Sequence, residues 1–518
     1  MNKKLVVSAL ALLMTVSVVG CGGKEETPGS SASATPTPAP TEDKNAPKPN
    51  LKALLTYTAN TDLNTYPVAK MLEEKTGYKV TYDMLPADKP EDKLNLIMAS
   101  GEAYDYINTA GSSVFRSLFV EYARRGALVD LTPLIDKYGP NIKAAMSQGT
   151  LDALKVDNKI YAIPNPSISV VNNTLAIRQD WLDKLGLKMP TTTDEFVAVL
   201  KAFKEKAPGG AGTIPFSVNG SNADTMGINT VNLIGAFGMP NGWNESSGKL
   251  VPRPLDSNFK SYLSFAVTLY KDGLLDKEFA INKDANLKEK FTSGKVGVIP
   301  MNWAEVPTIT DALVKNQPDA KIAFIQPLTG PGGKAGLGRS AGFDTLTYVP
   351  KSSKNQEAVV KWINAKLDKD IHKNLAIGEE GVHFTAKDGA YSPILPKFND
   401  DRNWAGKYMS GYDEKLYPIY WQARVRKDAR LFDAYTKMNN DIADKLKFPD
   451  LMGYIPPAQT VYSQNNQKLI TMINDFMIKA IITDGGINGL DAFIQQYKTS
   501  GGDDSVKEVD GWYATYKK

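Results

Sequence analysis

The chain of 518 residues contains one cysteine and two histidines. One cysteine cannot form an internal disulfide, a zinc–thiolate cluster or a redox pair, and two histidines leave few ligands for a histidine-based metal site. The 61 Lys and Arg residues nearly balance the 57 Asp and Glu residues, so the formal net charge is only +4. Because no strong basic field is present to hold a polyanion, we expect no nucleic-acid partner.

The single cysteine lies just after a leader segment. Residues 1–20 combine Lys3 and Lys4 with a short apolar core and small residues, a pattern typical of a secretory signal peptide. Residues 18–21 (Val-Val-Gly-Cys) resemble a bacterial lipobox, which implies cleavage before Cys21 and its lipidation, for instance by palmitate. Two or more acyl chains would anchor the protein stably. We therefore expect a lipid-anchored, extracellular protein on the outer face of the bacterial cytoplasmic membrane.

The segment that follows Cys21 has almost no large apolar side chains that could form a hydrophobic core. Residues 22–50 contain six prolines and many Ser, Thr and Ala residues, but no Ile, Leu, Val or aromatic residue. Such a composition predicts a disordered tether over 21–50, which could reach about 90 Å if it were fully extended. No apolar run beyond it approaches the roughly 18 residues of a membrane-spanning helix.

From Leu51 onward, strand and helix patterns alternate. The sequence predicts strands near 51–57, 78–84 and 104–108, with amphipathic helices around 68–72 and 94–98 between them. This β-α-β-α-β order favours a mainly parallel sheet covered by helices. Ligands of such sheets bind beyond the carboxyl ends of the strands, which directs attention to the turns that follow the first and third strands.

A second unit of the same kind begins after residue 165. We expect a strand at 174–178, a helix at 180–186 and another helix that starts with the capping box Thr192–Glu195. Further strands are predicted at 295–301 and 346–349, and further helices at 359–366 and 469–481. No internal repeat is visible.

Several segments, taken in order, resemble extracellular solute-binding proteins of carbohydrate ABC importers, in particular large Gram-positive lipoproteins and alginate- or oligosaccharide-binding proteins. The resemblance covers most of 51–518. The segments that carry it are 126–134 (GALVDLTPL), 157–164 (DNKIYAIP), 178–182 (RQDWL), 293–304 (SGKVGVIPMNWA), 379–384 (EEGVHF) and 501–512 (GGDDSVKEVDGW).

The resemblance implies an α/β fold of the two-lobed periplasmic-binding-protein type (type II). Each lobe would contain a mixed, mainly parallel sheet flanked by helices, with a ligand cleft between the lobes. The expected N-terminal lobe comprises 51–163 and about 335–395, and the C-terminal lobe about 164–334 and 396–518. The implied partners are a carbohydrate and the permease subunits of an ABC importer, with the receptor itself a monomer.

In one loop the sequence departs from this family. Long members often carry an acidic calcium loop before the strand that corresponds to 214–216. Here the loop 207–213 reads APGGAGT and contains no carboxylate, whereas calcium prefers six to eight oxygen ligands, several of them from Asp or Glu. We therefore expect no metal at this loop, and no cofactor.

A sugar site needs an aromatic platform surrounded by polar groups. Trp303 follows a predicted strand and matches the family position whose tryptophan stacks on the ligand. Trp243 lies in a polar loop, so it does not belong to the buried face of a predicted helix. The candidate polar partners all lie at predicted strand ends or in family-like loops. They are Asn60, Asp62, Thr109, Ser112, Glu305, Asp344, Glu380 and His383.

Two other classes of protein remain possible. A receptor for peptides or another polar solute would share the fold. An anchored enzyme acting on glycans is the other alternative, and Gly338–Gly342 does fit the Gly-x-Ser-x-Gly pattern of hydrolases. That pattern requires a strand before the serine and a helix after it. Here a strand is predicted after Ser340, so we interpret the match as accidental and expect no catalytic residues.

Overall fold

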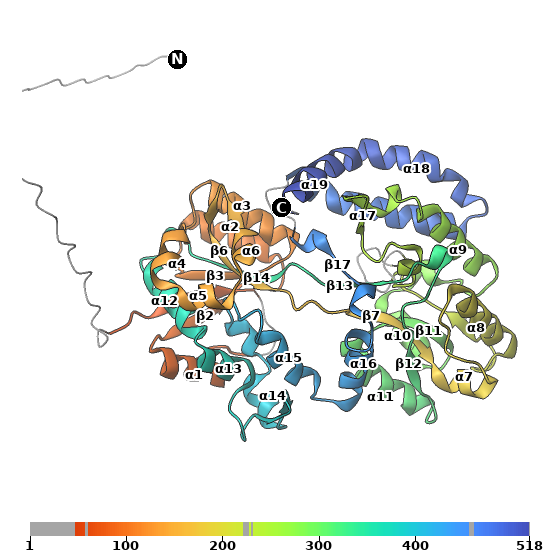
Figure 1. Cartoon of the computed structure of the whole chain (residues 1–518), viewed down its shortest axis with the longest axis horizontal. Coiled ribbons are helices and arrows are strands. Elements are labelled where there is room, and N and C mark those ends of the chain that lie inside the picture. Colours follow the sequence, from red (N-terminus) through yellow and green to blue (C-terminus); the bar gives the residue numbers. More distant parts are fainter. Residues whose placement is uncertain (1–46, 57–60, 221–226, 229–231, 455–459, 517–518) are drawn as a thin grey trace, which may run out of the picture. The chain divides into compact units, whose positions relative to one another are not determined.

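The computed structural model describes residues 47–56, 61–220, 227–228, 232–454 and 460–516 (Figure 1). The expected signal peptide, Cys21 and most of the tether lie outside these residues. Pro47 to Asn50 are exposed coil, and Lys48 already contacts the folded protein: its Nζ donates to Thr76 O (2.6 Å) and lies 4.7 Å from the ring centre of Tyr78.

The first sheet has the strand order β2-β1-β3-β14-β6. In the described residues, β1 pairs in parallel with β2 and β3, and β14 pairs antiparallel with both β3 and β6. All strands except β14 therefore run in the same direction. The bounds are β1 Leu51–Leu55, β2 Val80–Met84, β3 Tyr106–Ala110, β6 Ala162–Pro166 and β14 Phe343–Tyr348.

The helices between the first strands form where their apolar spacing predicts them. α1 (Pro67–Thr76) begins with proline at its first position, ends at Gly77 in the left-handed conformation and buries Val68, Met71 and Leu72. α2 (Pro90–Ser100) likewise buries two aliphatic residues. The β-α-β-α-β prediction is confirmed, although β3 begins two residues later than expected.

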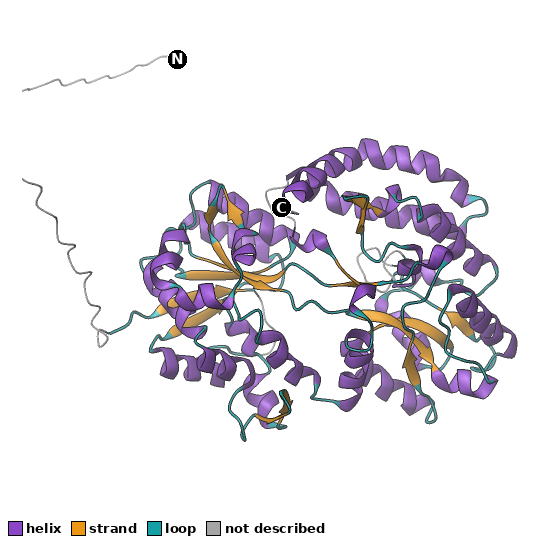
Figure 2. Cartoon of the chain, viewed as in Figure 1, coloured by secondary structure: helices purple, strands orange, loops and turns teal. Residues whose placement is uncertain are grey.

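The second sheet has the strand order β12-β7-β11-β8. β7 pairs antiparallel with β11 and β12, and β11 pairs in parallel with β8. Among these described strands, β8, β11 and β12 therefore run in one direction and β7 runs in the other. Figure 2 shows helices packed around both sheets. The bounds are β7 Asn173–Arg178, β8 Ile214–Phe216, β11 Val296–Asn302 and β12 Ile322–Phe324.

The second helix after β7, α8, confirms the predicted capping box. In α8 (Thr193–Lys206), Thr192 Oγ1 accepts from Glu195 N, and the Glu195 carboxylate accepts in return from Thr192 N. These bonds satisfy two of the helix's unpaired N–H groups. The buried face consists of Phe196, Val199, Leu200 and Phe203, as the spacing predicts.

Short elements and the remaining helices complete both lobes. The other strands are β4 Lys155–Val156, β5 Lys159–Ile160, β9 Trp243–Ser246, β10 Lys249–Pro252, β13 Leu337–Arg339, β15 Phe384–Lys387, β16 Ala390–Pro393 and β17 Lys447–Pro449. The other helices are α3 Ser113–Arg124, α4 Thr132–Tyr138, α5 Pro140–Ala145, α6 Gln148–Asp152, α7 Gln179–Leu185, α9 Phe259–Lys271, α10 Asp284–Thr292, α11 Val306–Asn316, α12 Gln356–Lys366, α13 Lys369–Ile377, α14 Lys397–Arg402, α15 Tyr417–Val425, α16 Ala429–Asn439, α17 Thr460–Ile482, α18 Leu490–Tyr497 and α19 Asp503–Tyr516.

Each sheet has its own hydrophobic core. The core of the first lobe joins residues of β1 and α12 to Phe398, Tyr408 and Ala423, so α14 and most of α15 pack on the first sheet. This packing extends the first lobe beyond the boundary expected near residue 395. The core of the second lobe joins β7 and α8 to residues of α17 and α18. We accordingly propose a lobe boundary near Val425.

Two extended segments, 166–171 and 339–344, connect the lobes and pair with each other. Ser167 N donates to Gly342 O (2.7 Å), and Ser340 N donates to Val170 O (2.8 Å). The Ser340 hydroxyl donates to Ile168 O (2.9 Å). We call these paired segments the hinge ribbon. The chain crosses between the lobes a third time between α15 and α16. The segment after β17 contacts the start of the hinge ribbon, where Asp450 N donates to Arg339 O (3.0 Å).

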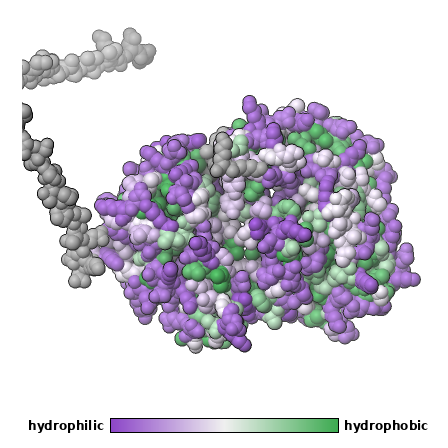
Figure 3. Space-filling view, viewed as in Figure 1, coloured by the Kyte–Doolittle hydropathy of each residue, from purple (hydrophilic) through white to green (hydrophobic). Residues whose placement is uncertain are grey.

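The visible surface carries no large apolar face. Figure 3 shows hydrophilic residues over much of it, with hydrophobic groups in small patches. Within the described ranges, no helix combines the length and the apolar character needed to cross a membrane.

The buried His372 makes the fold sensitive to acid. Its side chain is 2 % exposed, Nε2 accepts from Asp413 N (3.4 Å), and burial lowers its pKa to about 4. The unfolded chain binds a proton near pH 6.5, so stability falls as the pH drops from about 6.5 to about 4. Between pH 7 and 4.5 we expect this residue to cost about 2 to 3 kcal/mol in free energy of unfolding.

Urea unfolding across this pH range measures the effect. His372→Gln removes the titrating group, so the variant should lose less stability than the wild type on acidification, whatever its stability at pH 7. Equal losses in both proteins would contradict the assignment.

Candidate functional site

The edge of the first sheet gathers polar groups because β14 runs against its neighbours. Its start therefore lies beside the carboxyl ends of β3 and β6. Ser167 Oγ donates to Asp344 Oδ1 (2.6 Å), and Gly111 N donates to Asp344 O (2.7 Å). A Cβ on Gly111 would lie 1.8 Å from Phe343 O, so only glycine permits this close approach.

The carboxyl of Asp344 has a raised pKa although the residue is exposed. The residue is accessible to solvent, yet desolvation by the surrounding protein raises the pKa of its carboxyl above the usual value and outweighs the hydrogen bond from Ser167, which lowers it.

The loop 408–413 supports the end of β6 next to Asp344. Asn165 accepts from Gly411 N (2.5 Å) and donates to Thr345 Oγ1 (2.8 Å), while the Tyr412 hydroxyl donates to Pro166 O. Burial raises the pKa of Tyr412, and the nearby Asp344 raises it further. Sequence reasoning missed Ser167, Asn165 and Tyr412, because nothing in their local patterns indicates that Asn165 meets Gly411 or that Tyr412 meets Pro166.

Trp303 lies at the corresponding edge of the second sheet, directly after β11. Asn302 Oδ1 accepts from Ala304 N (2.9 Å) and fixes this turn. The indole meets Trp421 and Tyr435 edge to face, with ring centres 5.6 and 5.5 Å away. Its Nε1 is buried and has no hydrogen-bond partner in the described part of the chain. A buried donor without a partner requires an explanation, and a ligand acceptor would supply one.

This aromatic contact joins the two lobes. Trp421 belongs to α15, which packs on the first core, whereas Trp303 packs against the core around β11. Both rings also contact a cluster that contains Val170 of the hinge ribbon and Tyr435. The sequence left Trp421 without a role, because the spacing within α15 does not reveal which ring it meets.

A pocket of about 410 Å³ opens where β8 ends, at the same edge of the second sheet as Trp303. Asn219, Asn282 and Asp284 are among the residues that line it. Lys288 Nζ donates to Asp284 (2.7 Å) and also to Glu305, so an ion-pair chain links the pocket wall to the turn that holds Trp303. Glu305 is therefore placed near the candidate site, with its carboxylate engaged by Lys288.

A buried polar network supports this pocket from beneath. Asp276 accepts from Ser217 (2.7 Å), Asn282 (2.9 Å) and Lys290 (3.0 Å). Burial alone would raise the pKa of Asp276, but these donors outweigh it and hold the pKa below the ordinary value.

Some predicted polar residues lie elsewhere or have local roles. Asp62 is exposed, and its carboxylate accepts from Asn64 N (2.9 Å) and from Thr65 Oγ1 (3.1 Å), as in a turn cap. These bonds lower its pKa. Ser112 is exposed ahead of α3, and Glu380 is exposed beside β15. Asn60 lies outside the described residues.

Two further candidates are buried. Thr109 is completely buried on β3. His383 Nδ1 accepts from Glu379 N (3.0 Å), and its Nε2 lies 3.1 Å from Asp401 Oδ2. Burial lowers the pKa of His383. These contacts describe a structural role for His383 within the first lobe.

Trp243 is buried on β9 and meets Tyr462 edge to face at 5.8 Å. It packs with Leu250 and Trp512 in a cluster that does not include Trp303. The two tryptophans predicted as platforms therefore belong to different sites.

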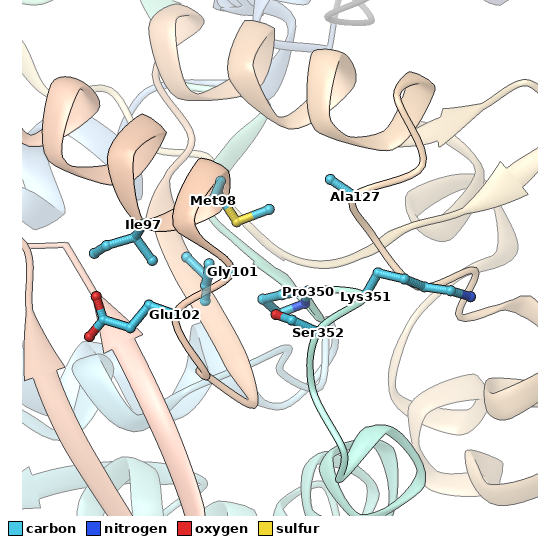
Figure 4. A pocket seen from close by; sticks show the side chains of 9 residues that line it. Ile97, Met98, Gly101, Glu102, Ala127, Pro350, Lys351 and Ser352 are labelled. Atoms are coloured by element: carbon cyan, nitrogen blue, oxygen red, sulfur yellow. The ribbon is translucent and has the colours of Figure 1, made fainter. Parts of the chain in front are cut away.

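A smaller pocket of about 180 Å³ lies at the opposite edge of the first sheet (Figure 4). It is formed by the end of α2 and by residues 350–352, which follow β14. Since Asp344 is at the start of β14 and this pocket is beyond its end, the pocket lies away from the strand ends where ligands of such sheets bind.

The loop expected to lack calcium contains an ammonium group instead. Lys295 Nζ donates to Ala211 O (3.0 Å) and Gly209 O (3.4 Å). These carbonyls already face a positive charge, which disfavours a cation there. In the described ranges no three His, Cys, Asp or Glu residues are grouped as metal ligands would be.

Ser340 of the Gly-x-Ser-x-Gly match belongs to the hinge ribbon. Its Oγ donates to Ile168 O and accepts from Val170 N (3.2 Å), and β14 follows it. The predicted strand after the serine is thus present, and its hydroxyl is bonded to the backbone of the opposite hinge segment.

Two lobes, paired connecting segments and polar sheet edges define the class of bilobal binding proteins. A family model described as bacterial extracellular solute-binding protein matches residues 59–370, and the chain belongs to this family.

Individual relatives extend the match. The chain is similar to Lipoprotein LipO of Bacillus subtilis (27 % identity, covering 100 % of this chain and 99 % of LipO). It is also similar to the fructooligosaccharide ABC transporter substrate-binding protein FusA of Streptococcus pneumoniae (30 % identity, covering 69 % of this chain and 68 % of FusA).

Solved structures show the same fold. FusA in complex with kestose has a TM-score of 0.68 at 22 % identity and covers 90 % of this chain and 99 % of FusA. The alginate-binding protein AlgQ2, solved without calcium ion, has a TM-score of 0.64 at 22 % identity and covers 90 % of this chain and 98 % of AlgQ2. The expected two-lobed fold is confirmed.

Calcium is expected to leave the Tm of the protein unchanged, because loop 207–213 offers no carboxylate and Lys295 occupies its carbonyls. Thermal unfolding of EDTA-treated protein, with and without calcium chloride, measures this. A calcium ion bound at 207–213 in crystals grown with calcium would contradict the prediction.

Proposed function

We propose that the protein is a membrane-anchored receptor that captures an oligosaccharide between its lobes and delivers it to the permease of an ABC importer. The observation that carries this proposal is the aromatic contact of Trp303 with Trp421, which brings together rings from both lobes beside the hinge ribbon. The names of FusA and its kestose complex support a carbohydrate as the solute class.

The site chemistry fits a sugar. A pyranose or furanose ring offers apolar C–H groups to an indole and hydroxyls to polar side chains. Trp303 supplies an indole with a buried, unpaired N–H, and Asp344 and the pocket beyond β8 supply acceptors and donors at the two sheet edges. The groups lie on elements of both lobes, so a ligand that bridges them favours a closed arrangement over an open one.

The hinge ribbon can accommodate such a movement. Its two segments are joined mainly by backbone hydrogen bonds and by the Ser340 hydroxyl, so a change in a few backbone dihedrals rotates one lobe while the sheets stay intact. In this proposal the receptor binds and releases an unchanged ligand, acts as a monomer without catalysis, and relies on partner ATPase subunits for energy.

The lobe boundary near Val425 and a lipid on Cys21 complete the proposal. The lipobox-like residues 18–21 support the anchor. The relative LipO, named a lipoprotein, agrees with it.

Trp303→Ala should weaken oligosaccharide binding by about 10- to 100-fold, because an aromatic stacking surface is lost. Isothermal titration calorimetry with kestose, followed by other oligosaccharides if kestose does not bind, measures the change. Trp404→Ala is the matched control, since Trp404 is also partly buried but packs only on the first core. Equal affinities of wild type and Trp303→Ala for the bound sugar would remove Trp303 from the site.

Mass spectrometry of the mature protein should find an N-terminus at acylated Cys21. Cys21→Ser should shift the protein from the membrane fraction to the medium, because no lipid is attached. An unmodified cysteine in the mature wild type would refute the anchor.

A further inference from the structure

A second pocket of about 410 Å³ lies in the second lobe, lined by residues of β9, β10, β17 and the loop before β9. Its size falls in the range of small-molecule sites. Its described lining includes Asn241, Trp243, Asn244, Glu245 and Phe448.

This pocket is separate from the Trp303 site. β13 and β17 form a two-stranded ribbon, and successive side chains of a strand point to opposite faces. Leu337 is buried in the cluster that Trp303 contacts. On the other face, a Cβ on Gly338 would lie 2.6 Å from Asn241 Oδ1, and Asn241 lines the pocket. The ribbon thus contacts the cluster of Trp303 through Leu337 and the pocket through Gly338, and Trp303 does not line the pocket.

The walls combine aromatic surface with amides. Trp243 is 9 % exposed and is held by Tyr462, whereas Phe448 is 40 % exposed. Asn241 Nδ2 donates to Phe448 O (3.2 Å) and Pro449 O (3.1 Å), and Asn244 Nδ2 donates to Asn241 O (2.8 Å). These bonds fix the walls in place, so the pocket is preorganised.

The charge of the lining restricts the ligand class. None of the described residues that line the pocket is basic, and Glu245 is the acidic one. Glu245 disfavours a uronate, phosphate or other anion, and the nearby Lys334, which passes beside Gly238, donates to Asn258 Oδ1 (2.5 Å). Aromatic and proline surface next to amide, hydroxyl and carboxylate groups suits a ring with apolar C–H faces and neutral hydroxyls.

We propose that this pocket, between β9 and β17, is a second binding site that takes a neutral sugar ring. The site does not depend on the proposed function of the Trp303 site, because it shares no residue with it.

Fluorine NMR of the full-length chain labelled with 5-fluorotryptophan tests the proposal. The Trp243 resonance is assigned with Trp243→Phe and followed while methyl β-D-glucopyranoside, methyl β-D-galactopyranoside or methyl β-D-fructofuranoside is added, with D-galacturonate as the anionic probe. We expect a saturable shift with at least one neutral glycoside at millimolar concentration and none with galacturonate.

Three variants locate the binding. Phe448→Ala, a partly exposed side chain whose loss should leave the fold intact, is expected to weaken the response at least about tenfold. Leu96→Ala, which truncates an exposed apolar residue on α2 (61 % exposed), should leave it unchanged. Trp303→Ala should also leave the response of Trp243 unchanged, which separates this pocket from the Trp303 site.

Three results would contradict the proposed second site. No saturable shift with any of the three neutral glycosides, or a shift with galacturonate alone, would overturn the proposal. A response abolished by Trp303→Ala would show that the Trp243 resonance only reports binding at the other site, and would overturn it as well.

Discussion

The reversed direction of β14 is the constraint on which the rest of the structure depends. Because it runs against β3 and β6, the chain returns from the second lobe at the edge where the neighbouring strands end. This return sets the hinge segments side by side and brings Asp344 to Ser167. It also demands a glycine at 111, since any side chain there would collide with the Phe343 carbonyl. The direction of β14 thus determines both how the chain connects the lobes and which polar groups meet at the sheet edge.

Aromatic packing then ties the lobes together where the hinge begins. Trp303 meets Trp421 and Tyr435 edge to face, and Trp421 and Tyr435 meet at a tilt. Such aromatic pairs are worth about 0.5 to 1.5 kcal/mol each beyond the area buried. Such a contact is strong enough to favour one arrangement of the lobes and weak enough for a ligand to compete with. Trp243 and Phe448 form the walls of a separate pocket. The protein therefore has two aromatic sites that share no residue.

Local sequence signals predicted the elements well. The Thr192–Glu195 capping box, the apolar face of α8 and the first β-α-β-α-β unit all form as expected, because hydrophobic spacing and capping act over a few residues.

The candidate site was only partly anticipated. Trp303 and Asp344 lie at the sheet edges, but Asp62 caps a turn and His383 is enclosed by Glu379 and Asp401. A polar residue after a strand can equally bind a ligand or close a turn, and its sequence does not distinguish these roles.

The sequence by itself determined the strand and helix periodicity, the near-neutral charge, the lipobox-like start and the absence of carboxylates in loop 207–213. Only the tertiary structure decided which distant residues meet: Asn165 with Gly411, Trp303 with Trp421, and α14 and α15 with the first core rather than the second. The physical reason is the distance along the chain over which each kind of interaction acts. Capping and periodicity depend on neighbours within one or two helical turns, whereas these contacts join segments more than a hundred residues apart, or are fixed by the choice of core on which a helix packs.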